Sequence, residues 1–335
     1  MKPILSFALC VVFSASGCTS RGALQEAPGA KSQAQNEDVS TPKSQVSSAK
    51  TAALQNQIKE IAAEAKGKVG VAAIVLDDGM QQADGSKQEA SAALVSLNPH
   101  ERFPMQSVYK LPISMAVMKQ VDAGKIKLSD RITISKDDLV GRVAHSPMRL
   151  RHPNGATLTV EELLRFAISE SDGATSDALM KLVGGPGAVQ AYLTELSIKD
   201  MIVLDTEVTL TQATTARYRN WTTPEASVAL LRALHERRGL SEPSQAVILK
   251  YMKEGPTGRR RLKGLLPAGT AVAHKTGTSA TDKGVTAATN DIGIITLPTD
   301  RHVAIAVFVS DSPADEATRE RVIAKIAKAV FEASK

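Results

Sequence analysis

The sequence predicts an α+β fold in which strand-forming segments on both sides of a long helical segment contribute to a sheet. A nearly continuous apolar run of strand length lies at 69–76, and strand signals return at 271–276, 290–297 and 302–310. Between them, residues 107–253 carry helical patterns, and amphipathic helices are expected at both ends of the folded part. This order predicts two lobes, and a cleft between lobes is where binding sites usually form.

The composition is that of a soluble globular protein with one large domain or two ordinary ones. Of the 335 residues, 43% are apolar and 23% are charged. Aromatic residues are only 3%, which argues against stacking platforms for single-stranded nucleic acid. The formal charge is +6, with no basic run that would follow a phosphate backbone. We therefore expect no nucleic-acid partner.

The first residues have the layout of a secretory signal peptide, predicted over 1–17. Lys2 precedes an apolar stretch that is too short to span a bilayer, and small residues follow it. The small residues end at Cys18, which resembles a bacterial lipobox, in which the cysteine becomes lipidated. The alternative is ordinary cleavage nearby, with Cys18 incidental. We expect a periplasmic protein anchored to a membrane through lipid at Cys18.

The remainder divides into a tether and a folded domain. Residues 18–50 are rich in Ser, Gln, Ala, Lys and Pro, with almost no large apolar residues, and predict a flexible tether. The domain is expected over 51–335. Its α/β lobe is predicted from 51–103 plus 254–335, and its helical lobe from 104–253.

Amphipathic helices are expected to open and close this domain. Leu54, Ile58 and Ile61 recur at helical spacing and predict a helix over 51–66. A closing helix is expected from Ser312 onward, with an apolar stripe formed by Val322, Ile323, Ile326 and Val330.

Local signals predict further elements between these helices. A strand is expected near 92–97. Thr159 with Glu162 forms a capping box that starts a helix. Thr222 with Glu225 has the same spacing and is expected to start another helix.

The first chemical signal is a Ser-x-x-Lys sequence, Ser107 and Lys110, at the start of an apolar helix. A spacing of three places the hydroxyl and the amine on one helix face. A serine becomes a nucleophile when a base removes its proton, and a lysine can be that base if its pKa is lowered. The other two Ser-x-x-Lys sequences lie in the tether, so the motif alone does not exclude that Ser107 and Lys110 are simply a solvated polar pair.

Three further segments follow in order along the chain. Ser171-Asp172-Gly173 comes after the capped helix, Glu207 lies in a polar stretch, and Lys275-Thr276-Gly277-Thr278 lies on a predicted strand. Each has a structural explanation of its own: Ser-Asp occurs four times, and Lys-Thr-Gly can be an edge strand that turns at the glycine. The ordered set is much less expected by chance.

This set resembles the serine β-lactamases of class A and the related penicillin-binding proteins. The resemblance runs from about residue 54 to 333 and is closest to the PER-type branch of class A. It is strongest in the segments 182–186, 261–278 and 287–291. In that branch a glutamate precedes an Asn-Trp pair by thirteen residues, a spacing that here selects Glu207. The implied fold is that of serine β-lactamases and D,D-peptidases.

The resemblance also implies residue roles. Ser107 would attack the β-lactam carbonyl, Lys110 would take or relay its proton, and Ser171 would pass a proton to the leaving nitrogen. Glu207 would hold the water that attacks the acyl-enzyme. Substrate binding would involve Lys275, Thr276, Gly277, Thr278 and Arg261, and the N–H groups of Ser107 and Thr278 would form the oxyanion hole. A surface position is the alternative for Arg261. The implied mechanism uses no metal and no cofactor.

Two positions depart from the family's pattern. Gly173 replaces the usual asparagine of the Ser-Asp-Asn motif, so the side-chain contact to the lysine and the substrate amide is absent unless water replaces it. Thr211 stands four residues after Glu207, where the family usually has Asn or His helping to hold the hydrolytic water. We expect an altered substrate preference or a slower enzyme.

The expected function is hydrolysis of β-lactams, cephalosporins and penicillins among them, by a monomer that confers antibiotic resistance. Two alternatives stay open: a penicillin-binding D,D-peptidase, and a slowly acylating β-lactam sensor. The D,D-peptidase does not need Glu207, and Gly173 is the residue that favours the sensor.

Overall fold

The computed structural model describes residues 42–76, 94–139, 141, 144–213 and 215–335, with side chains from residue 50 onward within these ranges. The predicted signal peptide, Cys18 and the tether up to residue 41 lie outside the described residues. Within the described residues, no helix is both long enough and apolar enough to cross a membrane.

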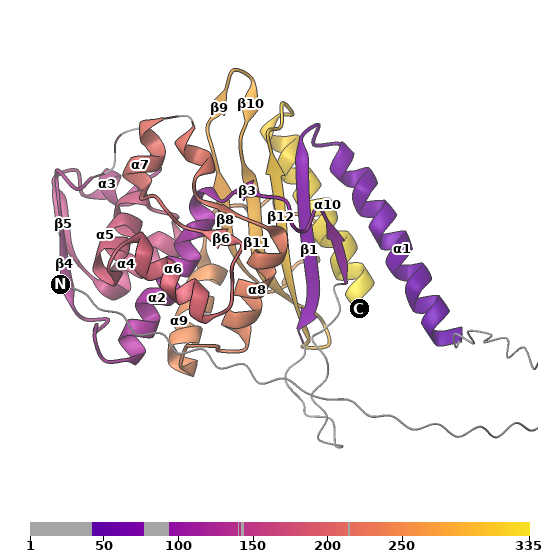
Figure 1. The fold of residues 1–335 in the computed structure, drawn as a ribbon, viewed down its shortest axis with the longest axis horizontal. Helices are drawn as coiled ribbons and strands as arrows, with labels where there is room; N and C mark the ends of the chain where they lie inside the picture. Colours follow the sequence, from indigo (N-terminus) through magenta and orange to yellow (C-terminus); the bar gives the residue numbers. More distant parts are fainter. Residues whose placement is uncertain (1–41, 77–93, 140, 142–143, 214) are drawn as a thin grey trace, which may run out of the picture. The chain divides into compact units, whose positions relative to one another are not determined.

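One antiparallel sheet of five strands organises the fold, in the order β2-β1-β12-β11-β8 (Figure 1). The strands come from both ends of the domain, as the sequence predicts. Their bounds are β1 Lys68–Leu76, β2 Val95–Leu97, β8 Val272–Thr278, β11 Thr289–Thr296 and β12 His302–Ser310. The central strand β12 pairs along its whole length with β1, so the two ends of the domain are joined by backbone hydrogen bonds.

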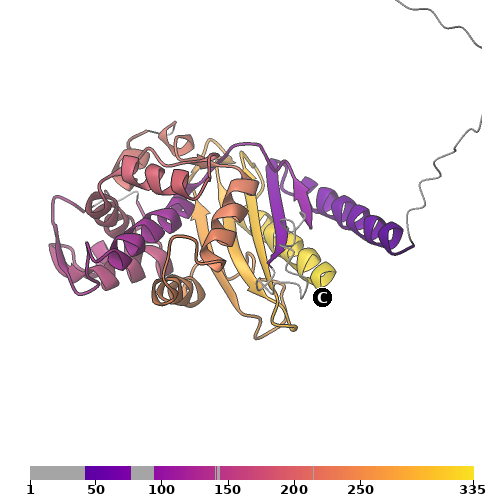
Figure 2. The ribbon, with the colours of Figure 1, turned by 60° about the horizontal axis from the view of Figure 1, so that its bottom comes forward.

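The two faces of the sheet pack on different helices because side chains alternate along each strand. On β12, Ile305 and Val307 point to one core, which α1 Pro42–Ala63 and α10 Glu316–Ser334 cover. Ala306 and Phe308 point to the other core, where α8 Pro224–His235 lies against β1 and β12. In Figure 2 the indigo and yellow helices lie together on one side of the sheet, and the magenta and salmon helices lie on the other.

The helical lobe surrounds α2 Lys110–Asp122, which contacts four other helices. All residues from Lys110 to Met118 are buried, which explains the apolar sequence around this helix. The neighbours of α2 are α4 Val160–Ser169, α5 Gly173–Val183, α6 Pro186–Glu195 and α9 Glu242–Glu254. Shorter helices are η1 Gln106–Tyr109, α3 Pro147–Arg151, α7 Glu207–Gln212 and η2 Ala216–Tyr218.

Small strands lie within and beside the predicted helical segment. They pair as β4 Arg131–Ser135 with β5 Gly155–Thr159, and as β7 Trp221–Thr222 with β3 Phe103–Pro104 and β6 Met201–Ile202. A hairpin joins β9 Thr281–Asp282 to β10 Val285–Thr286. Strands of two to five residues carry too little periodicity to be predicted.

Helix starts were predicted with mixed success. The capping box of Thr159 and Glu162 is confirmed. At α8 the prediction is wrong: Thr223, and not Thr222, is the N-cap, and its hydroxyl accepts from the N–H of Ala226. Thr222 belongs instead to strand β7, where its hydroxyl faces Ser227.

The two terminal helices begin elsewhere than predicted. Helix α1 starts at Pro42, so residues 42–50 of the predicted tether are helical. Those residues carry no apolar periodicity, and the sequence pattern gave no sign of them. Helix α10 starts at Glu316, with Asp315 as its N-cap, because Ser312 is still paired with Thr286 in a β-bridge.

Candidate active site

The Ser-x-x-Lys motif lies at a sharp turn at the edge of the helical lobe. Gln106 has a φ of 46°, an uncommon value for a residue with a side chain, and Ser107 follows it at the start of η1. The turn leads directly into α2, whose first residue is Lys110. The Lys110 Nζ lies 2.9 Å from Ser107 Oγ. The predicted pairing of hydroxyl and amine on one face is therefore present.

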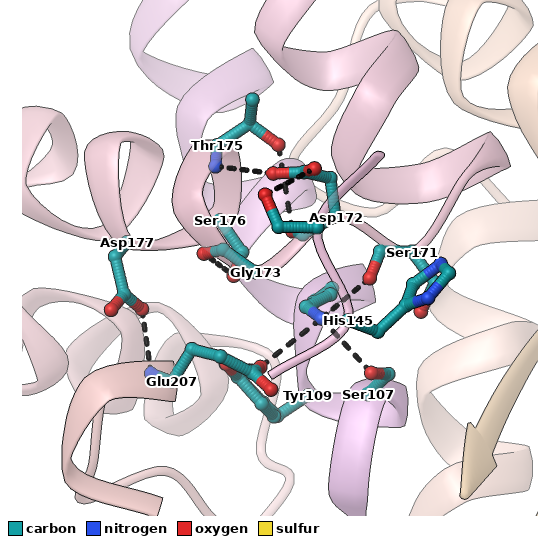
Figure 3. A network of polar contacts seen from close by, with 12 residues as sticks. Ser107, Tyr109, His145, Ser171, Asp172, Gly173, Thr175, Ser176, Asp177 and Glu207 are labelled. Atoms are coloured by element: carbon teal, nitrogen blue, oxygen red, sulfur yellow. Dashed lines mark hydrogen bonds and ion pairs between the residues drawn. The ribbon is translucent and has the colours of Figure 1, made fainter. Parts of the chain in front are cut away.

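Lys110 joins three parts of the site. Its side chain has no exposed surface. Besides the Ser107 hydroxyl, its Nζ donates to the carbonyl oxygen of Ser171 at 2.9 Å and lies 3.1 Å from Glu207 Oε2. A buried ammonium group needs such partners, because burying an unpaired charge is costly. Figure 3 shows Glu207, Ser107 and Ser171 gathered around one point of the site.

Glu207 reaches the site from the short helix α7, which begins with this residue. The carboxylate of Asp177, on α5, accepts the N–H groups of Glu207 at 2.6 Å and Val208 at 3.0 Å. Burial raises the pKa of Asp177 to about 6, although these two N–H donors oppose the rise. The side-chain amide of Asn220 bonds the chain at Leu204 and Asp205, which closes the loop that carries α7.

The Glu207 carboxyl group is held in its charged form. Burial alone would raise its pKa, but the charge of Lys110 and hydrogen bonds from Tyr109 and Lys110 lower the pKa below its ordinary value. Only 14% of the side chain is exposed. A buried carboxylate 3.1 Å from a lysine that also contacts a serine hydroxyl can accept a proton within the site.

Ser171, Asp172 and Gly173 have three different roles in the structure. Ser171 has a φ of 58°, and its backbone and hydroxyl face the two lysines of the site. Asp172 is the fully buried N-cap of α5 and points away from them. Gly173 donates its N–H to the carbonyl oxygen of His145 at 2.9 Å.

Lys275 places a second buried amine beside Ser171. It lies on β8 with 1% of its surface exposed, and its Nζ donates to Ser171 Oγ at 2.8 Å. Burial and then the charge of Lys110 lower the pKa of the Lys275 ammonium well below its usual range. Ser171 Oγ thus has a neighbouring proton donor and can itself pass on a proton.

The end of β8 and Arg261 form the fourth side of the site. The Arg261 guanidinium donates to Thr278 Oγ1 at 2.8 Å and to the carbonyl oxygens of Gly277 and Asn290. Arg261 is only 4% exposed, so the surface alternative is wrong for this arginine. A β-carbon on Gly277 would lie 2.3 Å from the carbonyl oxygen of Met105. Strand β8 and the turn that leads into Ser107 therefore approach each other closely, which requires a glycine. Thr276 Oγ1 donates to Thr257 Oγ1.

A cavity of about 390 Å³ opens onto some of these groups. Ser107, Glu207, Thr211 and Thr278 line it, together with His145 and Arg217. Thr211 Oγ1 donates to the carbonyl oxygen of Val208 at 2.9 Å, so its hydroxyl already has an acceptor. The structure brings together every predicted site residue from Ser107 to Thr278, whereas Cys18 lies outside the described residues.

Comparison with known proteins identifies the family. Residues 53–334 match the model of the Beta-lactamase enzyme family. The chain is 39% identical to the extended-spectrum β-lactamase PER-1 of Pseudomonas aeruginosa, over 85% of this chain and 88% of that protein. It is 41% identical to β-lactamase VEB-1 of the same species, over 70% of this chain and 79% of that one.

The chain belongs to the class A β-lactamase family.

A solved structure agrees with this family at the level of the fold. The crystal structure of a β-lactamase from Chitinophaga pinensis superposes with a TM-score of 0.77 at 41% identity, and the match covers 84% of this chain and all of that one. The α+β fold of a serine β-lactamase is therefore confirmed.

Three residues that support the site of this β-lactamase family member were not predicted from the sequence. Tyr109 lies inside the Ser-x-x-Lys motif and bonds Glu207, and a tyrosine in a fully buried helix is itself a signal, since its hydroxyl needs a partner. Asn290 ties β11 to the carbonyl oxygens of Pro104 and Met105, and an amide inside a buried strand is a comparable signal. Asp177 has no local signal, because its partner Glu207 is thirty residues away.

Proposed function

We propose that this protein hydrolyses β-lactams through an acyl-enzyme on Ser107 and thereby confers antibiotic resistance. The observation that carries the proposal is the contact of one buried lysine with both the Ser107 hydroxyl, at 2.9 Å, and the Glu207 carboxylate, at 3.1 Å. It supplies a nucleophile, a proton path and a base in one cavity. The names of the relatives PER-1 and VEB-1 support the same function.

In the first half-reaction Ser107 Oγ attacks the lactam carbonyl carbon and the ring C–N bond breaks. Lys110 Nζ takes the Ser107 proton as it gives one of its own protons to Glu207 Oε2, 3.1 Å away. Ser171 Oγ is the last donor and delivers a proton to the lactam nitrogen, supported by Lys275 Nζ at 2.8 Å. Glu207 loses its added proton to solvent before the second half-reaction, and Lys275 regains from solvent the proton that it supplies to Ser171. The N–H groups of Ser107 and Thr278 stabilise the negative charge on the carbonyl oxygen, and losing one such donor costs about 2.7–4 kcal/mol.

In the second half-reaction a water attacks the ester carbon of the acyl-enzyme. Glu207 takes a proton from that water, the bond to Ser107 Oγ breaks, and the proton returns to Ser107. The lowered pKa of the Glu207 carboxyl keeps it ready as a base at neutral pH. Thr211 lines the same cavity and is the proposed second contact of the water.

Substrate binding is assigned to the end of β8. Lys275 and Arg261 bring N–H donors there, with Arg261 paired to Glu320, and Thr276 and Thr278 bring hydroxyl groups, a combination suited to the carboxylate of a β-lactam. We propose cephalosporins and penicillins as substrates. Gly173 offers no side chain to the substrate amide, so we expect a preference different from enzymes with asparagine there.

The arrangement of Glu207 favours hydrolysis over the two alternatives. A D,D-peptidase or a slowly acylating sensor requires Ser107 and Lys110 but does not need Glu207. Here a charged carboxylate lies 3.1 Å from the catalytic amine, and three backbone or side-chain contacts hold its helix in place.

We also propose that the protein is a periplasmic lipoprotein, anchored through Cys18 and active as a monomer. The support is the sequence of residues 1–18 and the fact that all proposed catalytic groups come from one chain. Intact-mass measurement of protein extracted from membranes should show a lipid adduct, and Cys18→Ser should abolish it. Size exclusion with light scattering tests the monomer.

The decisive test of the function is hydrolysis of a chromogenic cephalosporin by the full chain purified in mild detergent. We expect steady turnover, its loss in Ser107→Ala, and accumulation of acyl-enzyme by mass spectrometry in Glu207→Ala. A single acylation of the wild-type protein without turnover would reject hydrolysis and support the sensor.

A further inference from the structure

Tyr109 stands inside the Ser-x-x-Lys motif, directly before Lys110, and is fully buried. Its hydroxyl donates to Glu207 Oε2 at 2.8 Å. Burial and then the charges of Glu207 and Asp177 raise the pKa of the Tyr109 hydroxyl well above its ordinary value. The phenol therefore keeps its proton at neutral pH and acts as the donor in this hydrogen bond.

Two donors converge on the same oxygen of Glu207. Lys110 Nζ lies 3.1 Å from Oε2, which also accepts from Tyr109. In the part of the chain that the structure describes, no hydrogen bond reaches the other oxygen, Oε1. With Oε2 fixed from two sides, Oε1 is the oxygen left to accept a hydrogen bond from water. Figure 3 shows Tyr109 and Glu207 side by side, with Asp177 at the far end of the Glu207 residue.

Gly173 provides the room for this arrangement. A β-carbon at position 173 would lie 2.6 Å from Cγ and 3.2 Å from Cδ of Glu207, closer than side-chain atoms pack. The Glu207 side chain thus passes directly over the glycine on its way to Tyr109. Gly173 and the Tyr109 hydroxyl therefore belong to one arrangement. The absence of a side chain at position 173 leaves space for the Glu207 side chain, and the Tyr109 hydroxyl bonds the carboxylate at the end of that side chain.

We propose that Tyr109 is a positioning residue for deacylation: its hydroxyl fixes the orientation of the Glu207 carboxylate so that Oε1 faces the hydrolytic water. This inference rests on the proposed β-lactam hydrolysis. A purely structural role, in which Glu207 merely satisfies a buried hydroxyl, would give the same distance but different kinetics.

The test compares Tyr109→Phe with Tyr192→Phe in the full chain. Tyr192 is a matched control, since its hydroxyl is also buried, on α6, and has no hydrogen-bond partner among the described residues. The readouts are the rate of acyl-enzyme decay, followed by quenched flow and mass spectrometry with a chromogenic cephalosporin, and the pH dependence of that decay. Thermal unfolding is recorded for each variant.

We expect Tyr109→Phe to slow acyl-enzyme decay about ten- to a hundred-fold, the factor expected for a hydrogen bond to a charged group. The Tyr109 hydroxyl lowers the pKa of Glu207, so its removal raises that pKa. A larger fraction of Glu207 is then protonated at a given acidic pH, and the acid limb of the decay profile moves to higher pH. Tyr192→Phe should change neither the rate nor the profile.

A second variant keeps the inference testable if Tyr109→Phe does not fold. Placing 3-fluorotyrosine at position 109 retains the ring and makes the hydroxyl a stronger donor, so the acid limb should move to lower pH. An unchanged decay rate and pH profile in either folded variant, beside a wild-type protein that turns over, would overturn the role of Tyr109 alone. A wild-type protein without turnover would overturn both this role and the proposed hydrolysis.

Discussion

The side chain of Glu207 lies where a side chain at position 173 would otherwise be. A β-carbon there would meet Glu207 Cγ at 2.6 Å and the carbonyl oxygen of His145 at 3.3 Å. Glu207 cannot simply swing aside, because Lys110 and Tyr109 hold its carboxylate and Asp177 holds its backbone. The glycine of the Ser-Asp-Gly motif is therefore a space requirement of this site as well as a missing substrate contact.

Restoring a side chain at position 173 should therefore harm the enzyme. We expect Gly173→Ala to lower kcat for a cephalosporin by about a hundred-fold, since displacing a catalytic group by about 1 Å can cost that much. Gly173→Asn, which recreates the family motif, should be no better. Gly187→Ala is the control, because a β-carbon there meets no atom within 4 Å. Full activity of Gly173→Ala would show that Glu207 has room to move.

At the residue scale, the sequence was sufficient where chemistry is carried by a motif. Ser107 and Lys110 lie in a pattern whose spacing already implies contact, and Ser171 and Lys275 lie in short motifs that resemble those of a known family. The same reasoning left Arg261 undecided, because its burial depends on strand β11 and on Glu320 of the last helix. Contacts between residues far apart in the chain leave no local trace in the sequence.

At the scale of elements, Asp172 joins the start of α5 to the segment that leads into α3. Its Oδ1 accepts the N–H of Thr175 at 2.8 Å and caps the helix. Its Oδ2 accepts from Ser146 Oγ at 2.8 Å and from the N–H of Met148 at 2.7 Å. Asp172 is fully buried, so these bonds have no competition from water. The middle residue of the motif thus positions Ser171 without touching the cavity.

Removing this carboxylate should destabilise the fold strongly. We expect Asp172→Ala to lower the free energy of unfolding by about 3–5 kcal/mol, because a cap is lost and two buried donors are left without acceptors. Urea denaturation followed by circular dichroism measures it. Asp315→Ala removes the exposed N-cap of α10 and should have a much smaller effect. Equal losses in the two variants would mean that only the capping contribution of Asp172 matters.

Elements were predictable where burial gives the sequence a clear apolar pattern. The segments that became β1 and β12 are buried almost throughout and stand out as apolar runs, whereas β8 is equally buried but carries His274, Lys275 and Thr276. The capping sequence at Thr222 failed because Thr223 beside it offers the same hydroxyl. Choosing between them requires knowing that Thr222 pairs with Phe103 and Met201 in a small sheet.

At the scale of the molecule, the turn that leads into Ser107 is held between two distant parts of the chain. Asn290 on β11 donates its Nδ2 to the carbonyl oxygens of Pro104, at 2.8 Å, and Met105, at 3.2 Å. From the other side, the N–H of Met105 donates to the carbonyl oxygen of Asn220 at 2.9 Å. The sheet and the loop that carries Glu207 are both tied to the residue two positions before Ser107.

Breaking the contact from the sheet should therefore affect catalysis and stability together. Asn290→Ala leaves two buried carbonyl oxygens without their side-chain donor and frees the turn that orients Ser107 toward Thr278. We expect kcat/KM for a cephalosporin to fall about a hundred-fold and the melting temperature to fall with it.

Gln245→Ala separates these two effects. Gln245 also donates its amide to two backbone carbonyl oxygens, of Leu234 at 2.8 Å and His235 at 2.7 Å, but it joins two helices outside the cavity. It should lower the melting temperature while leaving kcat/KM near the wild-type value. If Asn290→Ala also kept its kcat/KM and lost only stability, the sheet would not be positioning the nucleophile. Ser107 would then be held by the helical lobe and the Asn220 contact alone.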